Sequence, residues 1–311
     1  MGASSEDTGA EDTGAEDTGA ECAGSDGADP RSRPAAAARS AAVLGHPVDH
    51  SLSPVLHGTA YRALGLDDWT YERIDCDAEQ LPALVGASSP ERVGYSVTMP
   101  GKFAALAHAT EVSDRARIVG SANTLVRRGD GWFADCTDVD GVTGALAAFG
   151  DLPDEPTAVV LGVGGTARPV LAGLAEAGAT RVVLASRRDN AGPATDCGRA
   201  LGLEIRTMLL TDAALPGEIE RADILINTIP EPGVRELTGL VEGARRLFDV
   251  LYDPWPTALG AAASAVGIPV VGGDVMLLNQ AFGQVELFTG RPAPREAMAE
   301  ALADALGRRP S

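Results

Sequence analysis

The sequence predicts an α/β protein of two domains. Its 311 residues are enough for two domains that each bury a core. From about Ser40 onward, short apolar segments typical of strands alternate with segments of helical spacing. Such alternation is typical of sheets built from crossover connections. We therefore expect one α/β domain over 38–138, completed by C-terminal helices within 274–311, and a second domain over 139–273.

The first 37 residues differ in composition from the remainder. Residues 6–20 read EDTGA three times, and 1–37 carry nine acids against two arginines, −7 of the total net charge of −19. A short repeat rich in glycine and acid cannot form an apolar face, so we predict a disordered acidic tail over 1–37. The remaining chain is also acidic, which argues against nucleic acid as a partner.

Membrane and secretory signals are absent from the sequence. No stretch of about 18 apolar residues occurs, and no basic region precedes an apolar run at the N-terminus. The four cysteines are scattered and include no C-x-x-C pair. We expect a cytoplasmic protein with a small-molecule substrate and no membrane partner, and assembly into a homodimer is left open.

The elements of the first domain can be placed in order. We expect strands at 41–45, 70–75 and 93–99, with helices at 53–66, 78–87 and 102–109 between and after them. Segments 122–128 and 131–137 should pair as a hairpin around Gly129-Asp130-Gly131.

The second domain repeats the alternation. We expect strands at 157–162, 181–188, 222–230, 245–252 and 268–273, and a helix at 164–178. Helices at 276–290 and 295–307 close the chain, and the last should pack on the first domain through Met298, Leu302 and Leu306.

A glycine-rich turn follows the first strand of the second domain. Gly162, Val163, Gly164, Gly165 and Thr166 lead from the strand into a helix. Glycines allow close approach of a pyrophosphate, and the helix N-terminus offers free N–H groups. The spacing is G-x-G-G, not the full G-x-G-x-x-G, so a tight turn without ligand is the alternative. The context favours a Rossmann-like dinucleotide-binding domain.

The end of the next strand bears on the choice of dinucleotide. It reads Ser186-Arg187-Arg188-Asp189. Arginine suits a 2′-phosphate, whereas an acid suits a ribose 2′-hydroxyl. The two arginines favour NADP, Asp189 keeps NAD open, and two solvated arginines on a turn are the alternative.

Several polar residues of the first domain lie where strands and helices meet, and they are candidates for a functional site. Lys102 is the only lysine beside 24 arginines, and it follows the turn after a strand. A lysine can give up a proton at a site where arginine cannot. Asp138 is expected to end the second hairpin strand. The other candidates are Ser51 and Ser53, which could also be helix caps, Thr98 and Asn123.

The histidines do not suggest a metal site. His46, His50 and His57 lie near one another in sequence, but no acid or thiol set completes a site. We therefore expect no metal, and we expect these histidines on loops and on a helix surface.

Six motifs in order resemble the shikimate dehydrogenase family. They are GHPVDHSLSPVLH, SVTMPGK, GSANTL, CTDVDG, GVGGTAR and MLLNQAF, and they span residues 43–283. The resemblance implies a two-domain enzyme that reduces 3-dehydroshikimate to shikimate with NADPH.

The resemblance also implies roles for individual residues. Lys102 and Asp138 would be the catalytic pair. Ser51, Ser53 and Tyr252 would hold the substrate carboxylate, and the ring hydroxyls would contact Thr98, Asn123 and Gln280. The cofactor would meet Asp114, Gly162, Val163, Gly164, Gly165, Thr166, Ser186, Arg187, Arg188, Val250, Gly273 and Met276, the last beside the nicotinamide.

The chain departs from the family pattern in places that could affect the substrate. Ser96 stands where the family usually has Asn, and Cys136 replaces an Asn two residues before Asp138. A quinate or aminoshikimate dehydrogenase is therefore an alternative, although the two serines at 51 and 53 favour shikimate. A non-catalytic nucleotide-sensing protein on the same fold is an alternative of another class, which the retained Lys102 and Asp138 disfavour.

Overall fold

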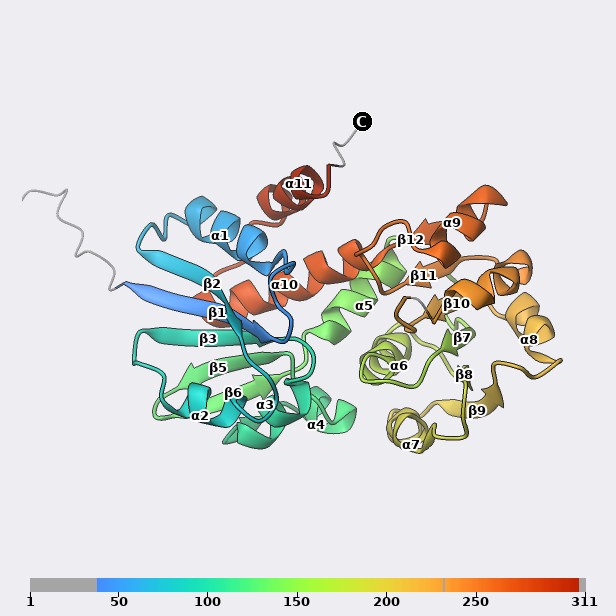
Figure 1. The fold of residues 1–311 in the computed structure, drawn as a ribbon, viewed down its shortest axis with the longest axis horizontal. Helices are drawn as coiled ribbons and strands as arrows, with labels where there is room; N and C mark the ends of the chain where they lie inside the picture. Colours follow the sequence, from blue (N-terminus) through green and yellow to red (C-terminus); the bar gives the residue numbers. More distant parts are fainter. Residues whose placement is uncertain (1–37, 232, 308–311) are drawn as a thin grey trace, which may run out of the picture. The chain divides into compact units, whose positions relative to one another are not determined.

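The computed structural model describes residues 38–231 and 233–307, so the predicted acidic tail over 1–37 lies outside the described residues. The described part contains two six-stranded sheets with helices on both faces, which confirms the α/β fold class (Figure 1). Within these two ranges, no helix is long and apolar enough to cross a membrane.

The first sheet is mixed and has the strand order β2-β1-β3-β5-β6-β4. Its strands are β1 (Arg39–Gly45), β2 (Trp69–Asp75), β3 (Arg92–Val97), β4 (Glu111–Val112), β5 (Thr124–Arg128) and β6 (Gly131–Asp135). β1 runs parallel to β2 and β3, whereas β5 runs antiparallel to β3 and β6. The pairing of Arg128 with Gly131 confirms the predicted hairpin.

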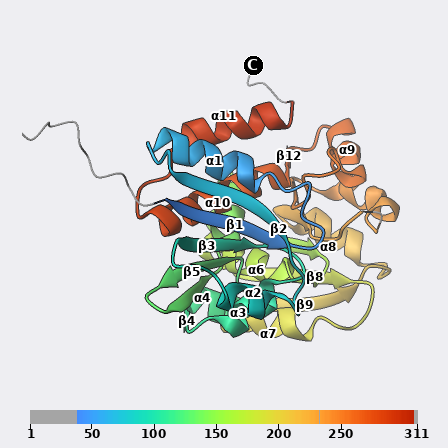
Figure 2. The ribbon, with the colours of Figure 1, turned by 60° about the vertical axis from the view of Figure 1, so that its left-hand side comes forward.

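Helices cover both faces of this sheet. They are α1 (Ser53–Ala63), α2 (Leu81–Gly86), α3 (Lys102–His108), α4 (Asp114–Val119), α10 (Gly273–Thr289) and α11 (Arg295–Ala305). α2 and α3 share a core with β1 and β3 through Leu81, Val85 and Ala105. On the other face α11 packs on α1 and α10 through Met298 and Leu302, as expected (Figure 2).

The second sheet is entirely parallel and has the order β12-β11-β10-β7-β8-β9. Its strands are β7 (Ala158–Leu161), β8 (Arg181–Ser186), β9 (Glu204–Leu209), β10 (Ile224–Asn227), β11 (Leu247–Asp249) and β12 (Val270–Val271). From the β9 edge the chain order is third, second, first, fourth, fifth, sixth, which is the Rossmann order. The order reverses between β7 and β10, and ligands of such sheets bind at the carboxyl ends of the strands there.

The remaining helices are α5 (Asp138–Ala147), α6 (Ala167–Glu176), α7 (Gly192–Ala200), α8 (Leu215–Arg221), the 3₁₀ helix η1 (Arg235–Gly243) and α9 (Ala258–Ala265). One face of the sheet buries Leu171 and Leu174 of α6, and the other buries Ile219 of α8 and Leu259 of α9. The sequence did not indicate β4, β9, α4, α5, α7, α8, η1 or α9.

α5 and α10 pack closely against each other. α5 joins β6 of the first sheet to β7 of the second, and α10 follows β12 and returns to the first sheet (Figure 1). Two glycines of α5 allow the close packing: a β-carbon on Gly141 would lie 2.6 Å from the Met276 carbonyl oxygen, and one on Gly144 would lie 2.2 Å from the Asn279 side chain. This contact fixes the start of α5, where Asp138 lies.

Candidate active site

Lys102 and Asp138 form an ion pair. Lys102 is the first residue of α3, and Asp138 is the first residue of α5. The Lys102 Nζ lies 2.6 Å from the Asp138 Oδ2, and the two side chains are 20% and 8% exposed. The prediction that Asp138 ends a strand is wrong, because β6 ends at Asp135 and a helix begins at Asp138. A carboxylate in the first helical turn interacts favourably with the helix dipole.

The environment keeps the Lys102 amine protonated. Burial alone would lower the pKa of Lys102, but the charge of Asp138 and its hydrogen bond outweigh burial, so the pKa is raised. Lys102 is therefore an ammonium at neutral pH, able to donate a proton to an oxygen bound beside it.

Asn123 and Gln280 form a hydrogen-bonded group on the Asp138 side of the pair. The Asn123 Nδ2 donates to the Asp138 Oδ1 at 3.0 Å and lies 3.1 Å from the Gln280 Oε1. Each Asp138 oxygen thus has its own donor, Asn123 on Oδ1 and Lys102 on Oδ2. Four of the predicted site residues are therefore joined by direct contacts, although they come from four separate segments of the chain.

The two candidate serines lie together at the start of α1. Ser51 and Ser53 are both buried, and the backbone N–H of Ser53 donates to the Ser51 Oγ at 3.3 Å. The residue at the N-cap is Leu52, so neither serine occupies the N-cap position, although the Ser51 Oγ accepts from the first N–H of the helix. The alternative that a serine is simply the helix cap is therefore wrong for Ser53, whereas Ser51 keeps a cap-like hydrogen bond.

Thr98 and Tyr252 are half-buried in loops. Thr98 follows β3 and Tyr252 follows β11. Within the described ranges, neither side chain is hydrogen-bonded to Lys102 or Asp138. Burial raises the pKa of the Tyr252 phenol, which keeps it a neutral hydroxyl donor.

The glycine-rich turn depends on glycine at Gly162 and is open at the two glycines that follow. Gly162 has a φ of 97°, and a β-carbon there would lie 2.4 Å from the Thr228 Oγ1. Gly164 and Gly165 are exposed, with no atom within 4 Å of an added β-carbon. Val163 precedes them, and Thr166 is the N-cap position of α6 without a side-chain cap. The turn thus presents bare backbone and a helix N-terminus at the carboxyl end of β7.

The arginines after β8 are available for a ligand. Ser186 ends β8, and its Oγ donates to the Arg188 carbonyl oxygen at 2.6 Å, which shapes the turn. Arg187, Arg188 and Asp189 are exposed. In the part of the chain that the structure describes, neither arginine side chain forms an ion pair. Their charge is thus free to meet a phosphate.

Four further candidates are placed separately from these groups. A β-carbon on Gly273 would lie 2.0 Å from the Val250 carbonyl oxygen, so these two residues touch. Met276 is buried in α10 against Gly141. Asp114 is exposed on α4 and forms an ion pair with Arg117. Among the described residues, none of the hydrogen bonds or ion pairs of Asp114 joins it to the glycine-rich turn.

Several buried polar residues near the pair were missed from the sequence. Gln284 is 1% exposed, and its Nε2 donates to the Thr124 Oγ1 at 3.2 Å. Gln280 and Gln284 lie one helical turn apart on the buried face of α10, and this spacing could have revealed Gln284. Tyr71 and Ser96 join the same network.

The expectation that His57 lies on a helix surface is wrong. Its side chain is fully buried on the inner face of α1, and the Nε2 lies 3.2 Å from the Gln284 Oε1. Burial lowers the pKa of His57 to about 3, against the raising effect of the Gln284 hydrogen bond. His57 is therefore neutral and donates its Nε2–H to Gln284. No group of three His, Cys, Asp or Glu residues in the described ranges could hold a metal ion.

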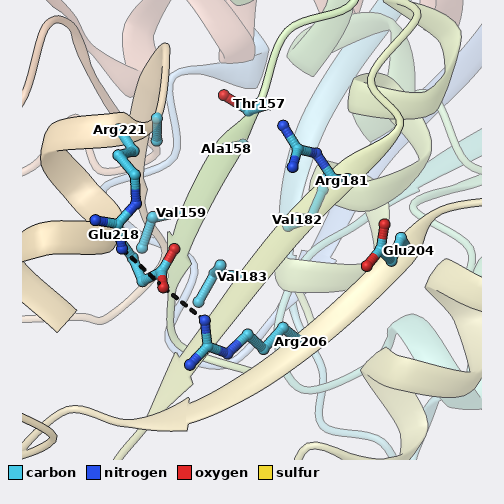
Figure 3. A pocket seen from close by; sticks show the side chains of 11 residues that line it. Thr157, Ala158, Val159, Arg181, Val182, Val183, Glu204, Arg206, Glu218 and Arg221 are labelled. Atoms are coloured by element: carbon cyan, nitrogen blue, oxygen red, sulfur yellow. Dashed lines mark hydrogen bonds and ion pairs between the residues drawn. The ribbon is translucent and has the colours of Figure 1, made fainter. Parts of the chain in front are cut away.

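A separate cavity of about 230 Å³ lies elsewhere on the second sheet (Figure 3). Thr157 and Arg181 line it at the amino ends of β7 and β8, and Glu218 pairs there with Arg206 and Arg221. Because nucleotides bind at the carboxyl ends of such strands, this cavity is not the dinucleotide site.

The comparisons with known proteins agree with this geometry. Residues 43–125 match the shikimate dehydrogenase substrate binding domain, and residues 275–303 match the shikimate 5′-dehydrogenase C-terminal domain. A shikimate dehydrogenase (NADP(+)) of Moorella thermoacetica is 35% identical over 277 residues, which cover 86% of this chain and 93% of the relative.

Solved structures show the same likeness. Mycobacterium tuberculosis shikimate dehydrogenase is 50% identical, with a TM-score of 0.81 over 86% of this chain and 99% of that chain. The Thermus thermophilus shikimate 5-dehydrogenase, solved in complex with NADP(H) and shikimate, is 33% identical with a TM-score of 0.74 over the same shares. The chain therefore belongs to the shikimate dehydrogenase family.

Proposed function

We propose that this protein catalyses the reversible, NADPH-dependent reduction of 3-dehydroshikimate to shikimate. The observation that carries the proposal is the Lys102–Asp138 pair, in which Asn123 fixes the carboxylate oxygen that Lys102 leaves free. The family relationship indicates which substrate and cofactor the protein uses, and the Lys102–Asp138 pair accounts for proton transfer to the substrate oxygen. When bound, the nicotinamide cofactor provides the hydride.

The pair suits the reduction of a ketone. Negative charge develops on the carbonyl oxygen as the carbonyl carbon is reduced, and the Lys102 ammonium stabilises that charge and gives the oxygen a proton. Asp138 holds the ammonium in place and accepts a hydrogen bond from the new hydroxyl. In the reverse direction, the hydroxyl returns its proton to a neutral Lys102 amine.

The remaining candidates divide between substrate and cofactor. We assign the substrate carboxylate to Ser51, Ser53 and Tyr252, and the ring hydroxyls to Thr98, Asn123 and Gln280. The pyrophosphate would lie on the turn at 162–166, and the 2′-phosphate on Arg187 and Arg188 beside Ser186. Val250, Gly273 and Met276 would line the nicotinamide, and Asp114 would approach the cofactor only from the exposed end of α4.

Domain boundaries follow from the same assignment. We propose that 38–138 with 274–311 forms the substrate domain and that 139–273 forms the cofactor domain. The passage of the chain through α5 and α10, which join the two sheets, supports this division.

An assay with four substrate pairs tests the proposed function. Purified full-length protein is given shikimate or quinate, each with NADP⁺ or NAD⁺, and formation of the reduced nucleotide is followed. The highest kcat/KM is expected for shikimate with NADP⁺. A higher value with quinate would assign the protein to the quinate dehydrogenases, and no turnover with any pair would favour a nucleotide-sensing protein.

A further inference from the structure

A row of buried hydroxyls extends from α1 into the hydrogen-bond network behind the active site. The Tyr71 hydroxyl donates to the Ser96 Oγ at 2.7 Å, and the Ser96 Oγ donates to the Gln284 Oε1 at 2.7 Å. Burial raises the pKa of the Tyr71 phenol, and the nearby Ser96 and Ser53 hydroxyls both act to lower it, which places Ser53 beside the Tyr71 hydroxyl as well. Ser53 and Ser96 are 5% and 4% exposed, so water cannot readily replace these bonds. Tyr71 therefore lies between a serine assigned to the substrate carboxylate and the interior network.

The direction of each hydrogen bond at the inner end is fixed. The Gln284 Nε2 donates to the Asn123 carbonyl oxygen and to the Thr124 Oγ1, so its Oε1 must accept from the other side. That oxygen accepts from the neutral His57 and from Ser96. Because a serine hydroxyl has one hydrogen, Ser96 has none left for a ligand.

The Tyr71 ring is held rigidly. It stacks on the His57 ring with centroids 4.1 Å apart and an interplanar angle of 9°. Tyr71 lies on β2, in register with Ala41 of β1. Burial raises the pKa of the Tyr71 phenol, which keeps it a hydroxyl at every working pH. Only the O–H bond can rotate, and its reachable acceptors in the structure are Ser96 and Ser53.

We propose that Tyr71 is a positioning residue for the carboxylate end of the substrate, acting through Ser53. When Ser53 turns its hydrogen toward a carboxylate, its oxygen becomes an acceptor, and Tyr71 can turn its own hydrogen from Ser96 to Ser53. The resulting chain of donors from Tyr71 to Ser53 to the carboxylate is polarised by the negative charge, which strengthens each bond. This inference rests on the proposed function, because it takes the substrate to be a carboxylate bound at Ser53.

The same contact accounts for the departure from the family at position 96. An asparagine is longer than a serine, and Ser96 already lies at hydrogen-bonding distance from the Tyr71 hydroxyl. We therefore expect an asparagine at 96 to crowd the Tyr71 oxygen.

Tyr71→Phe tests the proposal, with Tyr61→Phe as the matched control. Tyr61 belongs to the same aromatic cluster, and its buried hydroxyl has no hydrogen-bond partner. We expect Tyr71→Phe to raise the KM for shikimate by roughly three- to tenfold, less than the loss of a direct bond to a charged group. Its kcat and its KM for NADP⁺ should stay within about twofold, as should all constants of Tyr61→Phe.

Two further measurements separate positioning from a structural role. With the methyl ester of shikimate, which lacks the carboxylate charge, wild type and Tyr71→Phe should bind with equal Kd in isothermal titration calorimetry, whereas their Kd for shikimate should differ. Ser96→Asn should be less damaging in the Tyr71→Phe background than alone, because the crowded oxygen is gone.

The outcomes separate this inference from the proposed function. If shikimate binds but is not turned over, the proposed function fails while the Kd comparison still tests Tyr71. Equal shikimate Kd values for wild type and Tyr71→Phe, or an equal loss with the methyl ester, would overturn the role of Tyr71.

Discussion

The two sheets present their functional groups in opposite ways. Around the first sheet, polar side chains that include Asn123, Asp138 and Gln284 are buried and bonded to one another. At the carboxyl ends of the second sheet, Gly164 and Arg187 face solvent. The buried polar groups of the second sheet, such as Asn227 and Asp249, bond to each other and tie loops together.

The two regions are therefore expected to serve different functions. A buried network fixes side chains before the ligand arrives, so its loss should affect the rate of chemistry or the integrity of the fold. An exposed turn offers backbone and charge, so its loss should affect cofactor affinity alone. Substitutions in the two regions should therefore differ in whether they lower kcat, fold stability or cofactor affinity.

Lys102→Ala should have the largest effect. Loss of a positioned proton donor is expected to lower kcat by on the order of 10² to 10⁴, with a much smaller change in KM. Steady-state kinetics with shikimate and NADP⁺ measure both constants, and the melting temperature checks the fold. A fall in kcat of less than about tenfold would show that proton transfer does not depend on Lys102.

His57 should make the fold less stable in mild acid. The pKa of His57 is about 3 in the fold and about 6.5 in the unfolded chain. Between these values the unfolded chain binds a proton that the folded protein does not, so the free energy of unfolding falls as pH drops below 6.5. From pH 7 to pH 5 the contribution is about 2 kcal/mol.

Urea unfolding at pH 7 and pH 5 measures this effect. His57→Gln should remove about 2 kcal/mol of the pH dependence, whatever its effect on stability at pH 7. His50→Gln, at an exposed histidine, controls for the loss of a histidine as such. If the free energy of unfolding of wild type and His57→Gln depended on pH in the same way, His57 would take up its proton as readily in the folded protein as in the unfolded chain.

Arg187→Ala should have a smaller and more selective effect. The loss of a charged partner for the 2′-phosphate is expected to weaken NADPH binding by roughly tenfold and to leave NADH binding nearly unchanged. Arg206→Ala, at an exposed arginine of β9 paired with Glu218, is the matched control. Equal losses for the two nucleotides would show that Arg187 does not recognise the phosphate.

Much of the fold could be predicted because its strands and several helices have clear apolar patterns. α5 was missed because Gly141 and Gly144 lower helix propensity, and its close packing on α10 outweighs that cost. The placement of Asp138 at a strand end was wrong for the same reason.

The site was predicted less completely than the fold. Lys102 and Asp138 were found because a lone lysine and matched motifs drew attention to them. The burial of His57 and the position of Tyr71 depend on the packing of α1 and α10 on the first sheet. Residues 57, 71 and 284 are far apart in sequence, so no local pattern could predict that their side chains meet.

Lys102 and Asp138 are expected to act as one unit, and a double-mutant cycle measures their coupling. kcat is measured for wild type, Lys102→Ala, Asp138→Asn and the double variant with shikimate and NADP⁺. If the pair is one unit, each single substitution removes most of its contribution, and the double variant is little slower than the slower single variant. Losses in kcat that multiply would instead show that Lys102 and Asp138 contribute independently and are not one catalytic unit.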